Sequence, residues 1–326
     1  MCALSGCKFA IFIVTAVFVS GLEGQSASAQ NYPTKAVRIL AGSVGSGADM
    51  MSRSLGPLLS ERWGQPVVVE NRPQPVIRAD IVAKAPSDGY TLLMGEFSSH
   101  ASPPSLYKKL SYDPVKDFAA ITLISKAPLL LVAHASMPAS NVNEFMAYAK
   151  QRPGTIRYAA QSGSSNGRLT MELFNRRAGL DMLYVPYKGP AFSLNALLAQ
   201  EAEVSFLSVA AAFPQVNAGK LKAYAITSEK RFAKAPEIPT MIESGLPGFE
   251  STLWFAMFAP ARTPPALIKK LNRDMVEIVQ TLSFQSVTLA QGAEVTPSTP
   301  EELAAFVKSE ILKWGQIIKA IGIQPE

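Results

Sequence analysis

The sequence predicts an α/β protein in which short apolar strands alternate with amphipathic helices. Apolar runs of strand length recur along the chain, and stretches with helical spacing of apolar residues separate them. Two turns rich in glycine and serine, residues 42–49 and 163–167, each follow a predicted strand and precede a predicted helix. The 326 residues are 48% hydrophobic and 17% charged, which suffices for two ordinary domains with buried cores.

The N-terminal residues 1–29 are predicted to be a secretory signal peptide. Lys8 precedes an apolar run at 9–22, and an Ala-Ser-Ala cleavage motif occupies 27–29. The run is shorter than the roughly 20 residues that a membrane helix needs. Both cysteines lie in this leader, so the exported chain, starting near Gln30, has no thiol for a disulfide, a nucleophile or a metal site.

Charge and histidine content disfavour several function classes. The net charge is +6, but lysines and arginines are scattered without interleaved aromatic residues, so nucleic acid is not expected as a partner. A mildly basic surface suits small anions or serves solubility alone. The two histidines, His100 and His134, stand apart from any acidic cluster, so neither a metal nor another cofactor is expected.

The elements follow in a regular order. A strand at 36–40 leads into the turn at 42–49 and a helix that ends near Gly64. Pro264 and Pro265 mark the start of a helix, and Thr299, Pro300 and Glu302 form a capping box at the start of the last one. Further strands are expected at 67–69, 91–94, 129–132, 156–160, 183–185, 204–207, 221–227 and 253–258.

The first turn has glycines in the spacing G-x-x-G-x-G, at 42, 45 and 47. A dinucleotide site needs G-x-G-x-x-G and an acidic residue about 20 positions later, and neither is present. Backbone N–H groups at the start of a helix suit any carboxylate, however. Asp49 is expected to cap this helix rather than to touch a ligand.

The second turn matches the nucleophile elbow G-x-S-x-G at 163–167, with Ser165 as the nucleophile. In that hydrolase fold the catalytic histidine follows the serine, whereas both histidines of this chain precede it. The elbow therefore lacks its base, and an exported serine hydrolase remains only an alternative. Hydroxyl, amide and backbone donors at 164–166 instead suit an anion, and two such turns from separate lobes can converge on one ligand. A binding protein is favoured over an enzyme.

The chain resembles the receptor family of tripartite tricarboxylate transporters, often called Bug proteins. The resemblance extends over essentially the whole mature chain. The motifs that carry it occur in order: YP at 32–33, VR at 37–38, ENRP at 70–73, DGYTLL at 88–93, YDPVKDF at 112–118, VPYKG at 185–189, AGKL at 218–221 and GLPGFE at 245–250.

This resemblance implies a two-lobed periplasmic-binding-protein fold, type II-like, with a mixed, mostly parallel sheet flanked by helices in each lobe. Residues 30–130 and 252–326 would form lobe 1, and residues 131–251 lobe 2. A monomer would capture a small carboxylate in the periplasm and deliver it to a membrane permease; a sensory receptor is the alternative. The candidate ligand-binding residues are Ser43, Gly45, Ser46, Gly47, Ser98, Ser99, Ser164, Ser165, Asn166, Tyr187, Lys188, Gly189 and Leu207.

The chain also departs from the family pattern around the expected cleft. The first turn is shorter than usual, and residues 74–80 replace a glycine-rich segment with bulkier side chains. Leu207 stands where aspartate is common, and Arg168 where histidine is common. Arg168 is either an exposed helical residue or a partner for a second carboxylate.

Overall fold

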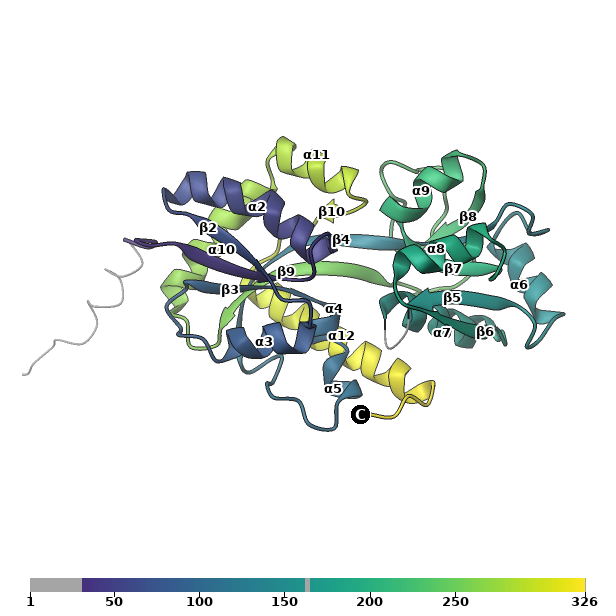
Figure 1. Cartoon of the computed structure of the whole chain (residues 1–326), viewed down its shortest axis with the longest axis horizontal. Coiled ribbons are helices and arrows are strands. Elements are labelled where there is room, and N and C mark those ends of the chain that lie inside the picture. The colour runs from purple at the N-terminus through teal and green to yellow at the C-terminus, as the bar shows by residue number, and fades with distance from the viewer. Residues whose placement is uncertain (1–30, 162–164, 326) are drawn as a thin grey trace, which may run out of the picture.

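Two α/β lobes lie side by side and are joined in the middle by long strands (Figure 1). The computed structural model describes residues 31–161 and 165–325. The predicted signal peptide lies outside these residues. Within them, no helix is both long and apolar enough to cross a membrane.

The first lobe holds one half of a continuous mixed sheet. Its strands follow the order β2-β1-β3-β9-β4, and β10 pairs with β4. The strands are β1 (Val37–Ala41), β2 (Val67–Asn71), β3 (Thr91–Glu96), β4 (Phe118–His134), β9 (Thr252–Pro260) and β10 (Glu294–Val295). The helices are α2 (Gly47–Trp63), α3 (Pro75–Ala83), α4 (Phe97–His100), α5 (Pro103–Leu106), α10 (Pro265–Val279), α11 (Leu282–Ala290) and α12 (Pro300–Ala320).

The second lobe continues the sheet beyond β4 in the order β7-β5-β6, with β8 also paired to β4. Its strands are β5 (Arg157–Gln161), β6 (Leu183–Tyr187), β7 (Val204–Ser208) and β8 (Leu221–Ile226). Its helices are α6 (Val142–Lys150), α7 (Asn166–Ala178), α8 (Pro190–Leu198) and α9 (Val209–Asn217). Apolar side chains between these helices and the sheet, such as Phe145, Phe174 and Leu197, are wholly buried.

The predicted mixed sheet with helices on it is confirmed, with a parallel group of strands in each lobe and an antiparallel centre. Strand β1 is parallel to β2 and β3, and β5 is parallel to β6 and β7. Where β4 and β9 run between these groups, every pairing is antiparallel. Strand β9 is antiparallel to both β3 and β4, and β4 is also antiparallel to β7, β8 and β10.

Strand β4 carries the chain from one lobe to the other. It pairs with β9 as far as Pro128 and with β7 and β8 from Leu129 onward. At this change of partner, Leu129 and Thr227 bond twice, since Leu129 N donates to Thr227 Oγ1 at 2.8 Å and Thr227 N donates to Leu129 O at 2.9 Å. The lobe limits near residues 130 and 252 stay predictions.

Local capping explains several helix boundaries. The predicted capping box of α12 is confirmed: Glu302 N donates to Thr299 Oγ1 at 3.1 Å, and Thr299 N donates to Glu302 Oε2 at 2.9 Å. Helix α10 begins at Pro265, as predicted. Helix α2 ends at Gly64, whose φ of 63° is a left-handed conformation that glycine adopts readily.

Candidate functional site

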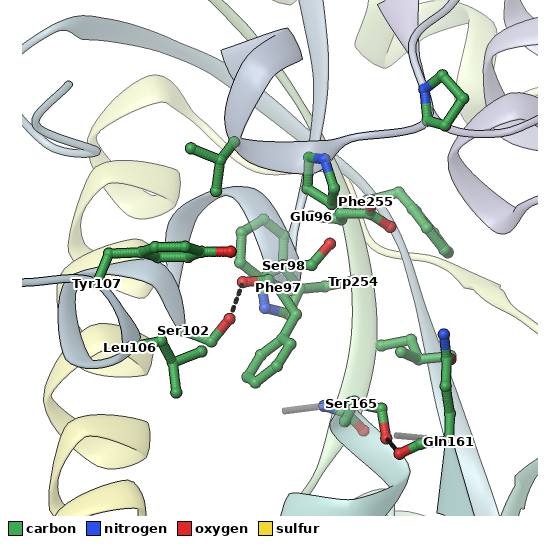
Figure 2. A pocket seen from close by; sticks show the side chains of 15 residues that line it. Glu96, Phe97, Ser98, Ser102, Leu106, Tyr107, Gln161, Ser165, Trp254 and Phe255 are labelled. Atoms are coloured by element: carbon green, nitrogen blue, oxygen red, sulfur yellow. Dashed lines mark hydrogen bonds between the residues drawn. The ribbon is translucent and has the colours of Figure 1, made fainter. Parts of the chain in front are cut away.

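A cavity of about 400 Å³ lies between the two lobes and is referred to below as the interlobe cavity (Figure 2). Lobe 1 contributes the start of α3, the turn from β3 into α4, the α5 region and the start of β9. Lobe 2 contributes the end of β5 and the start of α7. The lining residues are Pro73, Pro75, Val76, Glu96, Phe97, Ser98, Ser102, Leu106, Tyr107, Gln161, Ser165, Asn166, Leu253, Trp254 and Phe255.

The N-terminus of α7 opens onto the interlobe cavity. Ser165 is its N-cap: the hydroxyl accepts from Arg168 N at 3.3 Å and donates to Gln161 O at 2.9 Å. The first intrahelical bond runs from Leu169 N to Ser165 O, so the amides of Asn166 and Gly167 precede the regular ladder. These donors and the positive end of the helix dipole favour an anion at this point.

Asn166 adds a side-chain donor to this helix start. It is only 6% exposed, and its Nδ2 has no hydrogen-bond partner among the residues that the structure describes. Its Oδ1 accepts from Thr170 and Ser251, each at 3.4 Å. A buried amide N–H without a partner is unfavourable, and an anion in the cavity would satisfy it.

The wall of the interlobe cavity contains a charged side chain at one described position. Glu96 is the sole charged side chain among its described lining residues, and its side chain is 21% exposed. Behind it, Arg78 pairs with Glu96 Oε1 and donates from Nη1 to Arg72 O at 3.2 Å. Because the Arg78 side chain is only 1% exposed, the carboxylate of Glu96 faces the cavity and the guanidinium of Arg78 does not.

Aromatic side chains form the middle of the cavity wall. Trp254 and Phe255 come from β9, and Phe97 from the start of α4. Phe97 packs edge-on against Trp314 of α12, with ring centroids 5.1 Å apart. Phe97 is 4% and Phe255 5% exposed, so these two rings offer a ligand a small apolar surface, whereas Trp254 at 0% lies directly behind the wall.

Of the residues that the sequence predicts for ligand binding, Ser98, Ser165 and Asn166 line the interlobe cavity. Ser164 lies outside the described residues. Ser99 is buried beneath the wall, where its hydroxyl accepts from Glu96 N at 3.0 Å and bonds to His100 Nδ1 at 2.9 Å. Ser99 therefore holds the turn that carries Glu96 and Ser98.

The first turn does not line the interlobe cavity. A Cβ atom on Gly47 would lie 2.3 Å from Phe255 Cζ, so the Phe255 ring sits between the start of α2 and the cavity. Ser46 is the N-cap of α2, while Ser43 and Gly45 lie on the exposed outer part of the turn. The first turn and the start of α7 therefore do not line the same cavity in this arrangement.

The sequence predicts Asp49 as the cap of α2, but the N-cap is Ser46, and Asp49 lies in the first turn of the helix and organises the preceding loop. Its carboxylate accepts from Gly45 N at 2.9 Å and from Asn71 Nδ2 at 2.7 Å, and it pairs with Arg53 at 2.8 Å. Burial alone would raise the pKa of Asp49, but the bonds from Asn71 and Gly45 and the charge of Arg53 hold it below the usual value.

The predicted residues at the end of β6 and in β7 also lie off the cavity wall. Tyr187 donates to Glu201 Oε2 at 3.2 Å, Lys188 is exposed, and Gly189 is the N-cap of α8. Leu207 is 3% exposed and packs in the apolar core of lobe 2. Arg168 places its guanidinium over the Tyr184 ring, 4.3 Å from the centroid.

The histidines lie apart from Ser165. His100 bonds to Ser99, and His134 bonds to the Ser136 hydroxyl at 2.7 Å. The Ser165 hydroxyl is used in capping α7 and in the bond to Gln161. Within residues 31–161 and 165–325, no group of histidines, cysteines and carboxylates is arranged to hold a metal ion.

Sequence reasoning missed most of the cavity wall. Leu253, Trp254 and Phe255 belong to a run that is typical of a buried core, because apolar strands look alike whether they face a core or a cavity. Glu96 lies in a polar turn directly after a predicted strand. That position at the carboxyl end of a strand was a usable indication, since α/β proteins often bind ligands there.

Comparison with known proteins agrees with the fold. A profile described as "Tripartite tricarboxylate transporter family receptor" matches residues 51–323. Protein BugT of Bordetella pertussis is 33% identical over 316 residues, which cover 96% of this chain and 95% of that protein.

Two solved structures with ligands are similar over most of the chain. A protein of R. palustris with adipate is 33% identical in sequence and superposes with a TM-score of 0.80. The aligned region covers 90% of this chain and 100% of that protein's chain. MatC from Rhodopseudomonas palustris with bound malate is 29% identical in sequence and has a TM-score of 0.74. The aligned region covers 88% of this chain and 100% of the MatC chain.

Proposed function

The chain belongs to the tripartite tricarboxylate transporter receptor family, and we propose from this that it captures a small carboxylate between its lobes for a membrane transporter. Two relatives of similar fold were solved with adipate and with malate, which are both carboxylates. The interlobe cavity, at about 400 Å³, is of a size that suits such molecules.

The observation that carries this proposal is the open N-terminus of α7. The amides at its start and the buried Nδ2 of Asn166 offer hydrogen-bond donors, and Ser165 lines the same wall. Among the described lining residues no lysine or arginine is present, so the carboxylate would be held by these donors and by the helix dipole. Water can bridge part of such contacts at little loss of affinity.

Binding would favour closure of the two lobes. A ligand held by α7 of lobe 2 and by the wall of lobe 1 contacts both sides only when they are close together. Its greater affinity for the closed form would shift the population toward that form. The Leu129–Thr227 bonds lie where β4 passes between the lobes, and they suit a hinge that keeps its register.

The family consists of binding receptors, and the proposal extends this to a chain without catalytic activity of its own. It further places the mature protein in the periplasm, after removal of residues 1–29, as a monomer that docks on permease subunits. Ser165 supports this reading because its hydroxyl is occupied by Gln161 and Arg168 N and is not bonded to a histidine.

Thermal unfolding of the mature chain against a ligand panel tests the proposal. The panel would contain dicarboxylates, tricarboxylates, amino acids, aromatic monocarboxylates and neutral sugars. A ligand at 100 times its Kd adds about 2.7 kcal/mol of stability. At about 2–4 °C per kcal/mol, Tm should rise by several degrees. A rise confined to carboxylates supports the proposal; no rise with any carboxylate, from protein free of co-purified ligand, contradicts it.

A further inference from the structure

The wall of the interlobe cavity bears a negative charge at the end remote from α7. This charge is Glu96, the last residue of β3, and Figure 2 shows it well separated from Ser165 and Gln161. An anionic side chain is unexpected in the wall of a receptor for anions, because like charges repel at short range.

Arg78 does not cancel this charge on the cavity side. It lies behind Glu96 at 1% exposure and is held there by the ion pair and by its bond to Arg72 O. A group in the cavity therefore lies nearer to the carboxylate than to the guanidinium. Since the interaction falls with distance, the pair presents its negative end to the ligand.

From this arrangement we infer that the natural ligand carries a positively charged nitrogen in addition to its carboxylate, and that this nitrogen binds Glu96. The inference deepens the proposed function and rests on it. The ligand class is an amino-carboxylate whose body is apolar or aromatic. Its carboxylate would lie at the start of α7 and its nitrogen at Glu96, with the rings of Phe97 and Phe255 in the wall between them.

The side chains at the start of α3, beside Glu96, provide no hydrogen-bond donor for a second carboxylate. Pro73, Pro75 and Val76 line the cavity at the start of α3. Pro75 stands at the first helical position and has no N–H to donate, and the three side chains are apolar. A dicarboxylate would place its second anionic group against Glu96 and these side chains, without a cation among the described lining residues to receive it.

Matched compounds that differ in one end group test the inference by calorimetry. The aliphatic set is 6-aminohexanoate, adipate and hexanoate, and the aromatic set is 4-(aminomethyl)benzoate, terephthalate and 4-methylbenzoate. In at least one set, the amino-carboxylate should bind about ten- to hundredfold more tightly than the diacid and the monoacid, as a charge-assisted hydrogen bond predicts.

Substitution of the ion pair assigns this preference to Glu96. Glu96→Gln alone would leave the buried Arg78 without its counter-ion. The test variant is therefore the neutral double substitution Arg78→Met/Glu96→Gln. It should lose about tenfold or more of the preference for the amino-carboxylate over the monoacid. The control is Arg157→Met/Glu203→Gln, which removes an ion pair of lobe 2 whose residues do not line the cavity.

The possible results separate the inference from the function on which it rests. Wild-type protein that binds diacids or monoacids at least as tightly as amino-carboxylates overturns the inference and leaves the proposed function in place. A preference that survives in the double variant overturns the role of Glu96. If folded protein binds no carboxylate of either set or of the wider panel, the proposed function fails and the inference with it. Should the double variant not fold, the wild-type ranking decides.

Discussion

The indole nitrogen of Trp254 donates a hydrogen bond to Oε2 of Glu310 at 3.1 Å and so ties the cavity wall to the last helix. Trp314 donates to the same oxygen at 3.0 Å, and Lys313 donates to Oε1 at 2.9 Å. Glu310 is 4% exposed, so its charge is supported by these three donors rather than by water. A residue far along the chain thus fixes the orientation of a buried ring that supports the cavity wall from behind.

Glu310→Ala should destabilise the protein by about 2–4 kcal/mol, because it leaves two buried indole N–H groups without an acceptor. It should also shift the tryptophan fluorescence and weaken ligand binding, since Trp254, which supports the cavity wall from behind, loses its anchor. Urea unfolding and titration with a panel ligand measure the two effects. Glu310→Gln keeps an acceptor oxygen and should lose less stability. An alanine variant as stable as wild type would contradict this role.

Gly47→Ala should weaken ligand binding through Phe255. The added methyl group would lie within 3 Å of two Phe255 ring atoms, so the ring must move in the cavity wall. Calorimetry on the variant should show reduced affinity, and Gly47→Ala/Phe255→Leu should recover part of it by making room. Gly56→Ala in the same helix is the matched control. Its methyl group meets neighbours at 3.6 Å or more, and it should leave affinity unchanged.

Local sequence patterns predicted the elements of this fold well. The start of α12 depends on Thr299 and Glu302, and the start of α10 on Pro265, all of which act within one helical turn. The antiparallel centre of the sheet was not predicted. It depends on β4 and β9 meeting in space, and no local pattern encodes that meeting.

The candidate site was predicted only where it coincides with a helix start. Ser165 and Asn166 could be found because the turn before α7 has a recognisable composition. The first turn has a similar composition, yet Phe255 covers the start of α2 on the cavity side. Composition identifies donor-rich turns, whereas the packing of a distant strand decides which of them reaches the cavity.

The stability of the protein should fall as the pH drops below about 6.5, and His100 should account for part of the loss. His100 is fully buried, and its ring stacks on Phe258 with centroids 4.0 Å apart. Burial, and then the charge of Arg78, lowers the pKa of His100 to about 3. Between this value and the pKa of about 6.5 in the unfolded chain, the unfolded chain therefore binds a proton that the folded protein does not. Each unit by which the pH falls in this range lowers the free energy of unfolding by about 1.4 kcal/mol.

Urea unfolding at pH 7.5 and pH 5 measures this contribution. His100→Phe should reduce the difference between the two pH values by about 2 kcal/mol, which is the contribution of about 1.5 pH units below the unfolded pKa. His134→Gln, at a partly exposed histidine, should leave the difference unchanged. A His100→Phe variant with the wild-type pH dependence would show that other groups cause the loss.

Asn166→Ala should weaken the binding of every carboxylate that the protein takes, whatever group the ligand carries at its other end. The Nδ2 of Asn166 is buried in the cavity wall and has no partner among the described residues, so an anion there would gain a charge-assisted bond. Such a bond contributes about 1.5–3 kcal/mol, or roughly 10- to 150-fold in affinity. The substitution should leave the ranking within each matched set unchanged, because that ranking is assigned to Glu96.

Ser165→Ala should combine an effect on binding with one on stability. The hydroxyl lines the cavity and also caps α7, and loss of a helix cap costs about 1 kcal/mol. Thr299→Ala at the start of α12 removes a comparable cap away from the cavity and should lower stability without changing affinity. If the double variant Ser165→Ala/Asn166→Ala kept wild-type affinity, the carboxylate would have to be bound elsewhere. The exposed first turn around Ser43 and Gly45 would then be the place to test, because closure of the lobes could bring its donors to the ligand.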